Sequence, residues 1–268
     1  MRKGKKILII ILVIVILVFS LIAVGVFLVK KEQKEIKRQE KEAIINAEDN
    51  FKKLFLNLEY SENKNEAITL AYKIEKSEQG KYDVDVNIPL LNIETDVAKD
   101  INNEIKNVFG KKLYEIVKNG MAYTKYNVEY VAYTNNNIIS LVIKATLKEG
   151  ANPQRVIVQT YNYSLEENKL VNLDEYIKLQ GLDKNSIQTQ IINYIREKSQ
   201  NTNSALAEKY NVYVRDVRSD EYLIENIKMY YIGQDGKLYI VFAYGNNNFT
   251  ETVDVVIVNN EKWNANSK

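Results

Sequence analysis

The distribution of apolar residues is uneven along the chain, and a long apolar run near the N-terminus is its first feature. Within Ile7 to Val29 only Ser20 and Gly25 are not strongly apolar, and lysines flank the run on both sides. A helix of this length, at about 1.5 Å per residue, reaches roughly 34 Å and exceeds a hydrocarbon core of about 30 Å. The pattern predicts a transmembrane anchor over 7–29 that follows a tail of residues 1–6.

Two other interpretations fit this run less well. A buried core helix rarely needs so long a segment without a polar stripe. A cleavable signal peptide has a shorter apolar region that ends in a small-residue site, and Ser20 to Ala23 matches such a site poorly. An uncleaved anchor therefore fits the run best.

The charges beside the anchor leave its orientation open. Residues 1–6 hold four basic side chains, whereas residues 30–42 hold six basic side chains and four Glu. Counted alone, these charges favour a C-terminal domain in the cytoplasm. The N-terminal charges, however, are dense and without acids, and long domains translocate largely regardless of charge.

The anchor is followed by a segment that predicts a helical stalk over 30–65. Between Glu32 and Tyr60 there is no Gly or Pro, and Lys, Glu, Gln and Ala are frequent. That composition favours a helix. The alternative to a single helical stalk is a dimerising coiled coil, although no sustained heptad repeat is present.

From residue 66 onward, short segments of alternating apolar and polar residues predict strands. Pro89 is expected to stop the second strand, and Asn135 to Asn137 to form a hairpin turn. The predicted strands cover residues 68–74, 82–88, 123–133, 138–147, 154–165, 227–232, 238–243 and 252–258.

Helical periodicity separates these groups of strands. A long amphipathic helix is predicted over 96–118, and shorter helices over 174–179 and 183–199. The long helix is expected to bury one apolar face, made of Val97, Ile101, Ile105, Val108, Leu113, Ile116 and Val117.

The order of the elements predicts the fold class. The strands come in antiparallel runs separated by helices, without strict alternation of strand and helix, which favours an α+β fold. We expect antiparallel sheets packed with helices in two subdomains, 66–165 and 166–260, and a tail over 261–268.

The composition restricts the chemistry of this domain. The chain has no Cys and no His, which excludes disulfides, thiolate or imidazole nucleophiles and a lipoprotein anchor, and leaves only oxygen ligands for a metal. Its net charge is +2, but residues 43–268 hold 27 basic and 31 acidic side chains. The domain therefore disfavours nucleic acid and tolerates a cationic partner. We expect no cofactor.

Two carboxylate pairs and the tyrosines are the candidate sites of the chain. The pairs Asp83/Asp85 and Asp174/Glu175 are interpreted as solvated surface positions, so we expect no enzyme activity. The chain contains 19 Tyr, which suit both sheet packing and binding surfaces. The candidate partner-binding residues are Tyr123, Tyr133, Tyr161 and Tyr163.

Several segments in order resemble the RsiV-like extracytoplasmic domain, a domain of unknown function shared by lysozyme-responsive anti-sigma factors and some membrane-anchored peptidoglycan deacetylases. Asn152 stands where many members have His. The matching segments are Ile88 to Glu94 with Asp96 to Ile105, Gly150 to Pro153, Tyr161 to Leu165 with Lys169-Leu170, and Asp235 to Val241.

The resemblance implies a single-pass protein whose domain lies outside the cytoplasm and recognises a lysozyme-type hydrolase. Neither the anti-sigma function nor the deacetylase activity carries over, because the tail of residues 1–6 is too short for the first and the chain lacks the His residues of the second. We therefore expect a membrane-anchored binding module for a cell-envelope protein or a lysozyme-type hydrolase. The alternatives are a peptidoglycan-binding or glycan-binding envelope module and a cytoplasm-facing membrane scaffold.

Overall fold

A computed structural model of the chain describes residues 30–31, 66–120, 122–200 and 213–259. The predicted anchor, nearly all of the predicted stalk and the C-terminal tail lie outside the described residues. Within the described parts of the chain, no helix combines the length and the apolar character needed to cross a membrane.

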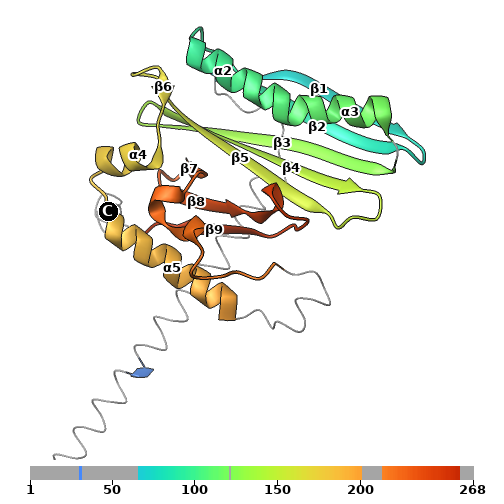
Figure 1. Cartoon of the computed structure of the whole chain (residues 1–268). Helices are drawn as coiled ribbons and strands as arrows, with labels where there is room; N and C mark the ends of the chain where they lie inside the picture. Colours follow the sequence, from blue (N-terminus) through green and yellow to red (C-terminus); the bar gives the residue numbers. More distant parts are fainter. Residues whose placement is uncertain (1–29, 32–65, 121, 201–212, 260–268) are drawn as a thin grey trace, which may run out of the picture. The chain divides into compact units, whose positions relative to one another are not determined.

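The larger of the two sheets, sheet A, has six strands in the order β1-β2-β3-β4-β5-β6 (Figure 1). All neighbours pair antiparallel except β2 and β3, which are parallel. The strands are β1 (Ile68–Glu78), β2 (Tyr82–Leu91), β3 (Thr124–Asn135), β4 (Ile138–Glu149), β5 (Arg155–Ser164) and β6 (Lys169–Leu170).

A helical crossover joins the parallel strands β2 and β3. It consists of α2 (Asp96–Ile105), a π-helical turn η2 (Lys106–Gly110) and α3 (Lys111–Asn119), and the Thr95 hydroxyl caps its start by accepting a hydrogen bond from the Ala98 N–H at 3.1 Å. The predicted helix over 96–118 is confirmed. The π turn adds a residue to the helical period, so Phe109 is buried whereas Val117 is 37% exposed.

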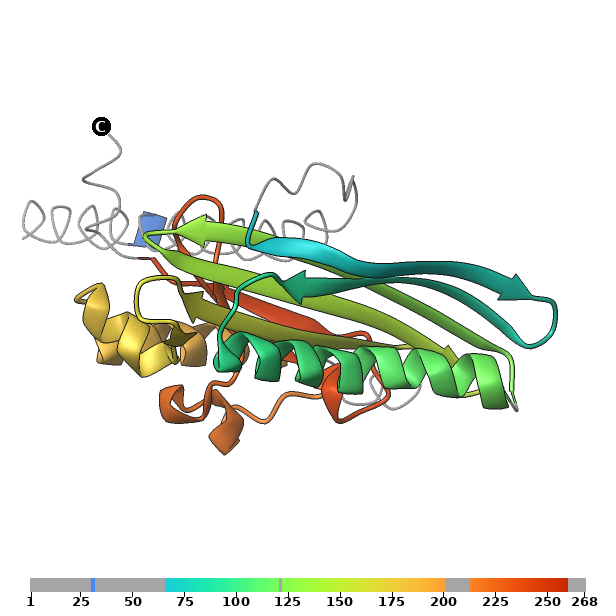
Figure 2. The same ribbon diagram turned by 90° about the horizontal axis from the view of Figure 1, so that it is seen from above.

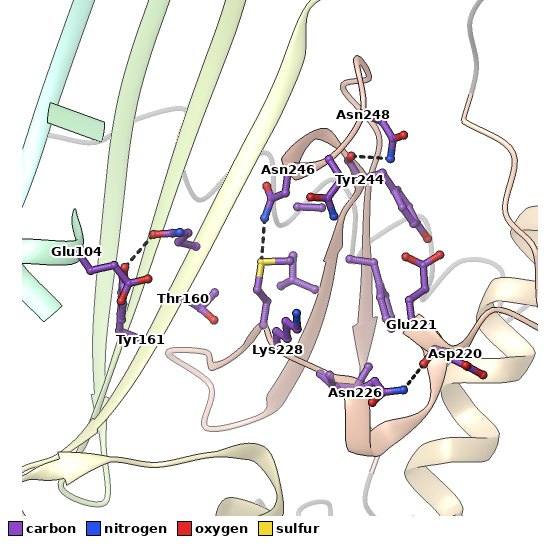
Figure 3. A pocket seen from close by; sticks show the side chains of 17 residues that line it. Glu104, Thr160, Tyr161, Asp220, Glu221, Asn226, Lys228, Tyr244, Asn246 and Asn248 are labelled. Atoms are coloured by element: carbon purple, nitrogen blue, oxygen red, sulfur yellow. Dashed lines mark hydrogen bonds between the residues drawn. The ribbon is translucent and has the colours of Figure 1, made fainter. Parts of the chain in front are cut away.

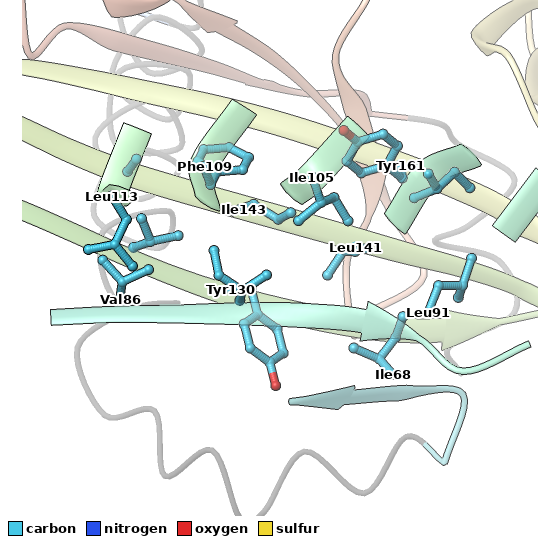
Figure 4. Packing of buried hydrophobic residues seen from close by; sticks show 14 of the residues in the cluster. Ile68, Val86, Leu91, Ile105, Phe109, Leu113, Tyr130, Leu141, Ile143 and Tyr161 are labelled. Atoms are coloured by element: carbon cyan, nitrogen blue, oxygen red, sulfur yellow. The ribbon is translucent and has the colours of Figure 1, made fainter. Parts of the chain in front are cut away.

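The crossover covers one face of sheet A (Figure 2). Apolar side chains from alternate positions of β2 to β5 meet those of the helices there. Figure 4 shows this packing, in which Ile105 and Phe109 face Leu141 and Ile143. The face forms one continuous apolar core.

The smaller sheet, sheet B, packs on the opposite face of sheet A. It contains β7 (Tyr230–Ile232), β8 (Leu238–Ala243) and β9 (Val253–Ile257), all antiparallel. Apolar side chains of the two sheets share a second core. The remaining elements are α4 (Leu173–Leu179), α5 (Lys184–Gln200) and the short 3-10 helices η3 (Asp220–Tyr222), η4 (Ile224–Asn226) and η5 (Tyr244–Asn246).

Polar side chains of sheet A hold the backbone of β7. The Tyr230 N–H donates to the Thr160 hydroxyl at 3.1 Å, and the Asn162 amide donates to the Tyr230 carbonyl at 2.8 Å. The Ile232 N–H donates to the Ser140 hydroxyl at 3.0 Å, and that hydroxyl in turn donates to the Asn162 side-chain oxygen at 2.6 Å. Side chains here take the place of a partner strand.

The α+β class is confirmed, with two corrections of detail. The first is the parallel pair β2/β3. The second concerns Pro89, because β2 continues through it to Leu91. Pairing of β2 with β3 ends at Val86, so the strand needs no N–H from Pro89 on that side. The predicted turn after β3 is confirmed by Asn136 and Asn137, whose φ angles are 47° and 60°.

Candidate functional site

A cleft of about 640 Å³ runs along the outer edge of β5, between that strand and the segments around η3, β8 and η5. Its volume lies within the range of about 300–1,000 Å³ that is usual for ligand pockets. Figure 3 shows Glu104 and Tyr161 on one side of the cleft and Glu221 and Tyr244 on the other. The cleft is thus built from both sheets and from the crossover.

The charged side chains that line this cleft are mostly acidic. Glu104 comes from α2, Asp220 and Glu221 come from η3, and Lys228 comes from the segment before β7. All four residues are exposed. Of the described residues that line the cleft, Lys228 is the only basic one. A surplus of carboxylates in a concave site attracts cationic groups.

Amide side chains form much of the remaining polar surface of the cleft. The Asn246 amide accepts a hydrogen bond from the Val158 N–H and donates one to the Val158 carbonyl, both at 2.9 Å. Asn226 donates to the Asp220 carbonyl at 2.8 Å, and Gln159 accepts from the Tyr161 hydroxyl at 2.8 Å. These bonds hold the amides in fixed orientations before any ligand arrives.

A buried polar network lies directly behind the cleft wall. The Arg215 guanidinium donates two hydrogen bonds to the Asp254 carboxylate, at 2.5 and 2.7 Å. The Tyr244 hydroxyl donates to the same carboxylate at 2.7 Å and lies 2.9 Å from the Tyr222 hydroxyl. Tyr213 stacks on Tyr244 with ring centroids 3.8 Å apart. The ring of a cleft residue, Tyr244, is therefore fixed by a buried ion pair.

The network shifts the pKa values of its members. Burial alone would lower the pKa of Arg215, but the hydrogen bonds and charge of Asp254 raise it above its ordinary value. The pKa of Tyr244 is also raised, chiefly by burial and secondly by the charge of Asp254. Burial and the neighbouring Glu221 carboxylate raise the pKa of Tyr213 to about 12. At physiological pH the Arg215 guanidinium is therefore charged and the tyrosines are neutral.

The structure places the four candidate tyrosines in different surroundings. Tyr161 lines the cleft, and Tyr163 is buried with its hydroxyl 2.9 Å from the Thr95 hydroxyl. Tyr133 lies on the other face of sheet A, with its ring centroid 6.5 Å from that of Tyr231. Tyr123 is 42% exposed and immediately precedes β3. The four do not form one surface.

The two carboxylate pairs have structural surroundings of their own. Asp83 and Asp85 are exposed on β2. Asp174 pairs with Lys184 at 2.9 Å. Glu175 completes a capping box with Asn172 at the start of α4. Among the residues the structure describes, no cluster of three or more Asp or Glu is close enough to hold a metal ion.

Apart from Tyr161, sequence reasoning missed the residues that form the cleft and its support. Glu104 and Asp220 are remote in the sequence, and no spacing connects them. Asp254 did carry a signal, because it is a charged residue inside the apolar strand Val253 to Ile257 and needs a buried partner there. That partner, Arg215, follows a part of the chain without a clear periodic pattern.

Comparisons with known proteins give only a distant structural likeness. No protein-family model matches the chain, and no curated protein matches it. Among solved structures it is similar to a DUF3298 family protein from Pseudomonas aeruginosa, at 7% identity and a TM-score of 0.42 over 69% of this chain and 88% of that chain. A DUF3298 family member from Bacteroides fragilis gives 8% identity and a TM-score of 0.37, over 70% and 88% of the two chains.

Proposed function

We propose that the chain is a single-pass, membrane-anchored binding module without catalytic activity, whose extracytoplasmic cleft receives a basic protein of the cell envelope. The acidic lining formed by Glu104, Asp220 and Glu221 carries this proposal. A lysozyme-type hydrolase is the partner class that the RsiV-like resemblance implies. Such a partner would supply positive charge that balances the surplus of carboxylates in the cleft.

The membrane placement is supported by the apolar run over 7–29. The external position of the domain is supported by the same resemblance and is opposed by the count of basic residues beside the anchor. Proteolysis of intact cells tests it. We expect the domain to be digested by protease added outside the cell. Survival of the domain until the cells are lysed would favour the cytoplasm-facing scaffold instead.

A binding role suits the chemistry of the cleft. The chain offers no imidazole or thiolate, and the amides in the wall are fixed by hydrogen bonds within the protein. Groups that are fixed in advance lose little entropy when a ligand binds. The geometry therefore favours recognition over group transfer.

Glycan binding is the second candidate, and the amide wall favours it. Asn226, Asn246 and Gln159 line the cleft together with Tyr161 and Phe242. Amides offer both donors and acceptors to sugar hydroxyls. A neutral glycan, however, brings no positive charge to balance the surplus of carboxylates.

Neutralising the cleft tests the proposed function. In the purified full-length chain, the triple change Glu104→Gln, Asp220→Asn and Glu221→Gln should weaken binding to an immobilised lysozyme-type hydrolase at least tenfold and reduce its salt dependence. The matched control carries the same loss of charge at exposed sites outside the cleft. It consists of Glu94→Gln, Asp100→Asn and Glu115→Gln.

The control triple variant should bind like the unmodified chain. Equal weakening by both triple variants would mean that net charge acts without the cleft, and would contradict the proposal. A parallel assay uses purified peptidoglycan. Retention on peptidoglycan without any binding to the hydrolase would support the glycan module.

A further inference from the structure

The outer edge of β5 has an incomplete set of hydrogen bonds. The even-numbered residues of β5 direct their backbone groups toward this edge, as the bonds of three of them show. The Val156 N–H donates to the Thr250 carbonyl at 3.0 Å, and the Val158 N–H and carbonyl bond the Asn246 amide. The Asn162 carbonyl accepts from the Val171 N–H at 2.8 Å.

Thr160 is the position that these bonds leave open. Backbone groups alternate along a strand, so the Thr160 N–H and carbonyl point to the same edge as those of Val158 and Asn162. Within the parts of the chain that the structure describes, neither group has a hydrogen-bond partner. The side-chain hydroxyl of Thr160 accepts a hydrogen bond from the Tyr230 N–H at 3.1 Å. Thr160 also lines the cleft.

The adjacent position shows what this edge accepts. At Val158, the Asn246 side-chain amide both accepts from the backbone N–H and donates to the backbone carbonyl. The backbone of an extended peptide offers the same combination, an N–H donor and a carbonyl acceptor. An exposed strand edge commonly binds an extended peptide in this way.

We propose that the cleft binds an extended peptide segment of the basic partner, whose backbone pairs with Thr160 while a flanking Lys or Arg reaches the cleft carboxylates. This rests on the proposed function and names how the partner is held. The acidic residues lie on both sides of the open position, Glu104 from α2 and Glu221 from η3. An N-acetyl sugar could offer an amide to Thr160 but brings no cation, so the charges favour the peptide.

Amide NMR on the full-length chain tests this pairing. The probe is the capped peptide acetyl-Lys-Val-Lys-Val-Lys-amide, added to the ¹⁵N-labelled protein in detergent micelles. We expect a shift of the Thr160 amide resonance and at least tenfold slower hydrogen exchange there. The Val158 amide is an internal control, because it is already bonded to Asn246 and should change little.

Analogues of the probe separate the two kinds of contact. Esters that replace each internal amide in turn remove one backbone donor, and one of them should weaken binding about tenfold, an amount expected for a lost hydrogen bond. Replacement of every Lys by Gln should weaken binding through loss of the cation. Equal binding by all the esters would overturn the backbone pairing.

The remaining outcomes distinguish this inference from the proposed function. Tight binding of the hydrolase without any change at Thr160 would overturn the pairing and leave the proposed function standing. Protection of Thr160 by an N-acetylglucosamine trimer, but not by the peptide, would overturn the peptide as occupant. If neither hydrolase nor peptide binds, both proposals fail.

Discussion

The two faces of sheet A are covered in different ways. On one face, the crossover helices pack through Ile105, Phe109 and other apolar side chains against the sheet. On the other face, sheet B packs against sheet A through an apolar core. It is also held by hydrogen bonds from polar side chains of sheet A, such as Ser140 and Asn162. The first face stabilises the sheet mainly through apolar contacts, although the Tyr126 hydroxyl also donates a hydrogen bond to the Phe109 carbonyl there, at 3.2 Å. The second fixes the geometry of a site.

Directional contacts fix the part of the cleft wall that sheet B and the segments around it form. Apolar packing is proportional to buried area and has little directional preference. A buried hydrogen bond fixes the distance and angle between two groups, and an unsatisfied buried group is costly. The network of Arg215, Asp254 and Tyr244 therefore positions the cleft wall more strictly than an apolar contact would.

The largest effect in this comparison should come from breaking the buried ion pair. Asp254→Ala leaves the Arg215 guanidinium buried without its partner, and we expect a loss of about 3–5 kcal/mol in the free energy of unfolding. Urea unfolding of the full-length chain measures this loss. The matched control is Asp216→Ala, which breaks the exposed pair with Arg218 at 3.4 Å and should cost at most about 1 kcal/mol.

This change should also weaken binding in the cleft. Without Asp254, the Tyr244 hydroxyl loses its acceptor at 2.7 Å, so the ring on the cleft wall is less well fixed. Hydrolase binding by the folded fraction should fall, whereas the Asp216→Ala variant should bind normally. A stable Asp254→Ala protein with unchanged affinity would show that the network does not support the cleft.

The difference between the two faces also explains how much of the structure could be predicted from the sequence. Periodicity indicated the strands of both sheets and the crossover helix because burial of one face leaves a local pattern. It misplaced part of the inward helix face, since the π turn before Lys111 shifts the period and brings Phe109 inward. No local pattern announces such an insertion.

The cleft was beyond sequence reasoning for a related reason. Glu104 and Glu221 come from distant parts of the chain, and their approach depends on how the sheets pack. The open backbone position at Thr160 depends on which neighbours occupy the rest of the β5 edge, and its residue type gives no sign of it. Of the tyrosines chosen from the strand pattern, Tyr161 lines the cleft and Tyr163 is in the core.

Two substitutions with smaller expected effects compare the two faces of sheet A directly. Asn162→Ala removes the donor to the Tyr230 carbonyl and the acceptor of the Ser140 hydroxyl, and should cost about 1–3 kcal/mol. Ile105→Val removes one methylene from the helix-side core and should cost about 0.5–1.5 kcal/mol. Urea unfolding and hydrolase binding are measured on both variants.

The binding measurement decides whether the faces differ in function. Asn162 holds the backbone of β7 beside Thr160, so its loss should move the cleft wall and weaken hydrolase binding by the folded protein. Ile105 packs between the crossover and sheet A and does not line the cleft, so its shortening should leave the affinity unchanged. If Ile105→Val weakened binding as much as Asn162→Ala, a general loss of rigidity would explain both, and the polar contacts would have no special part in shaping the cleft.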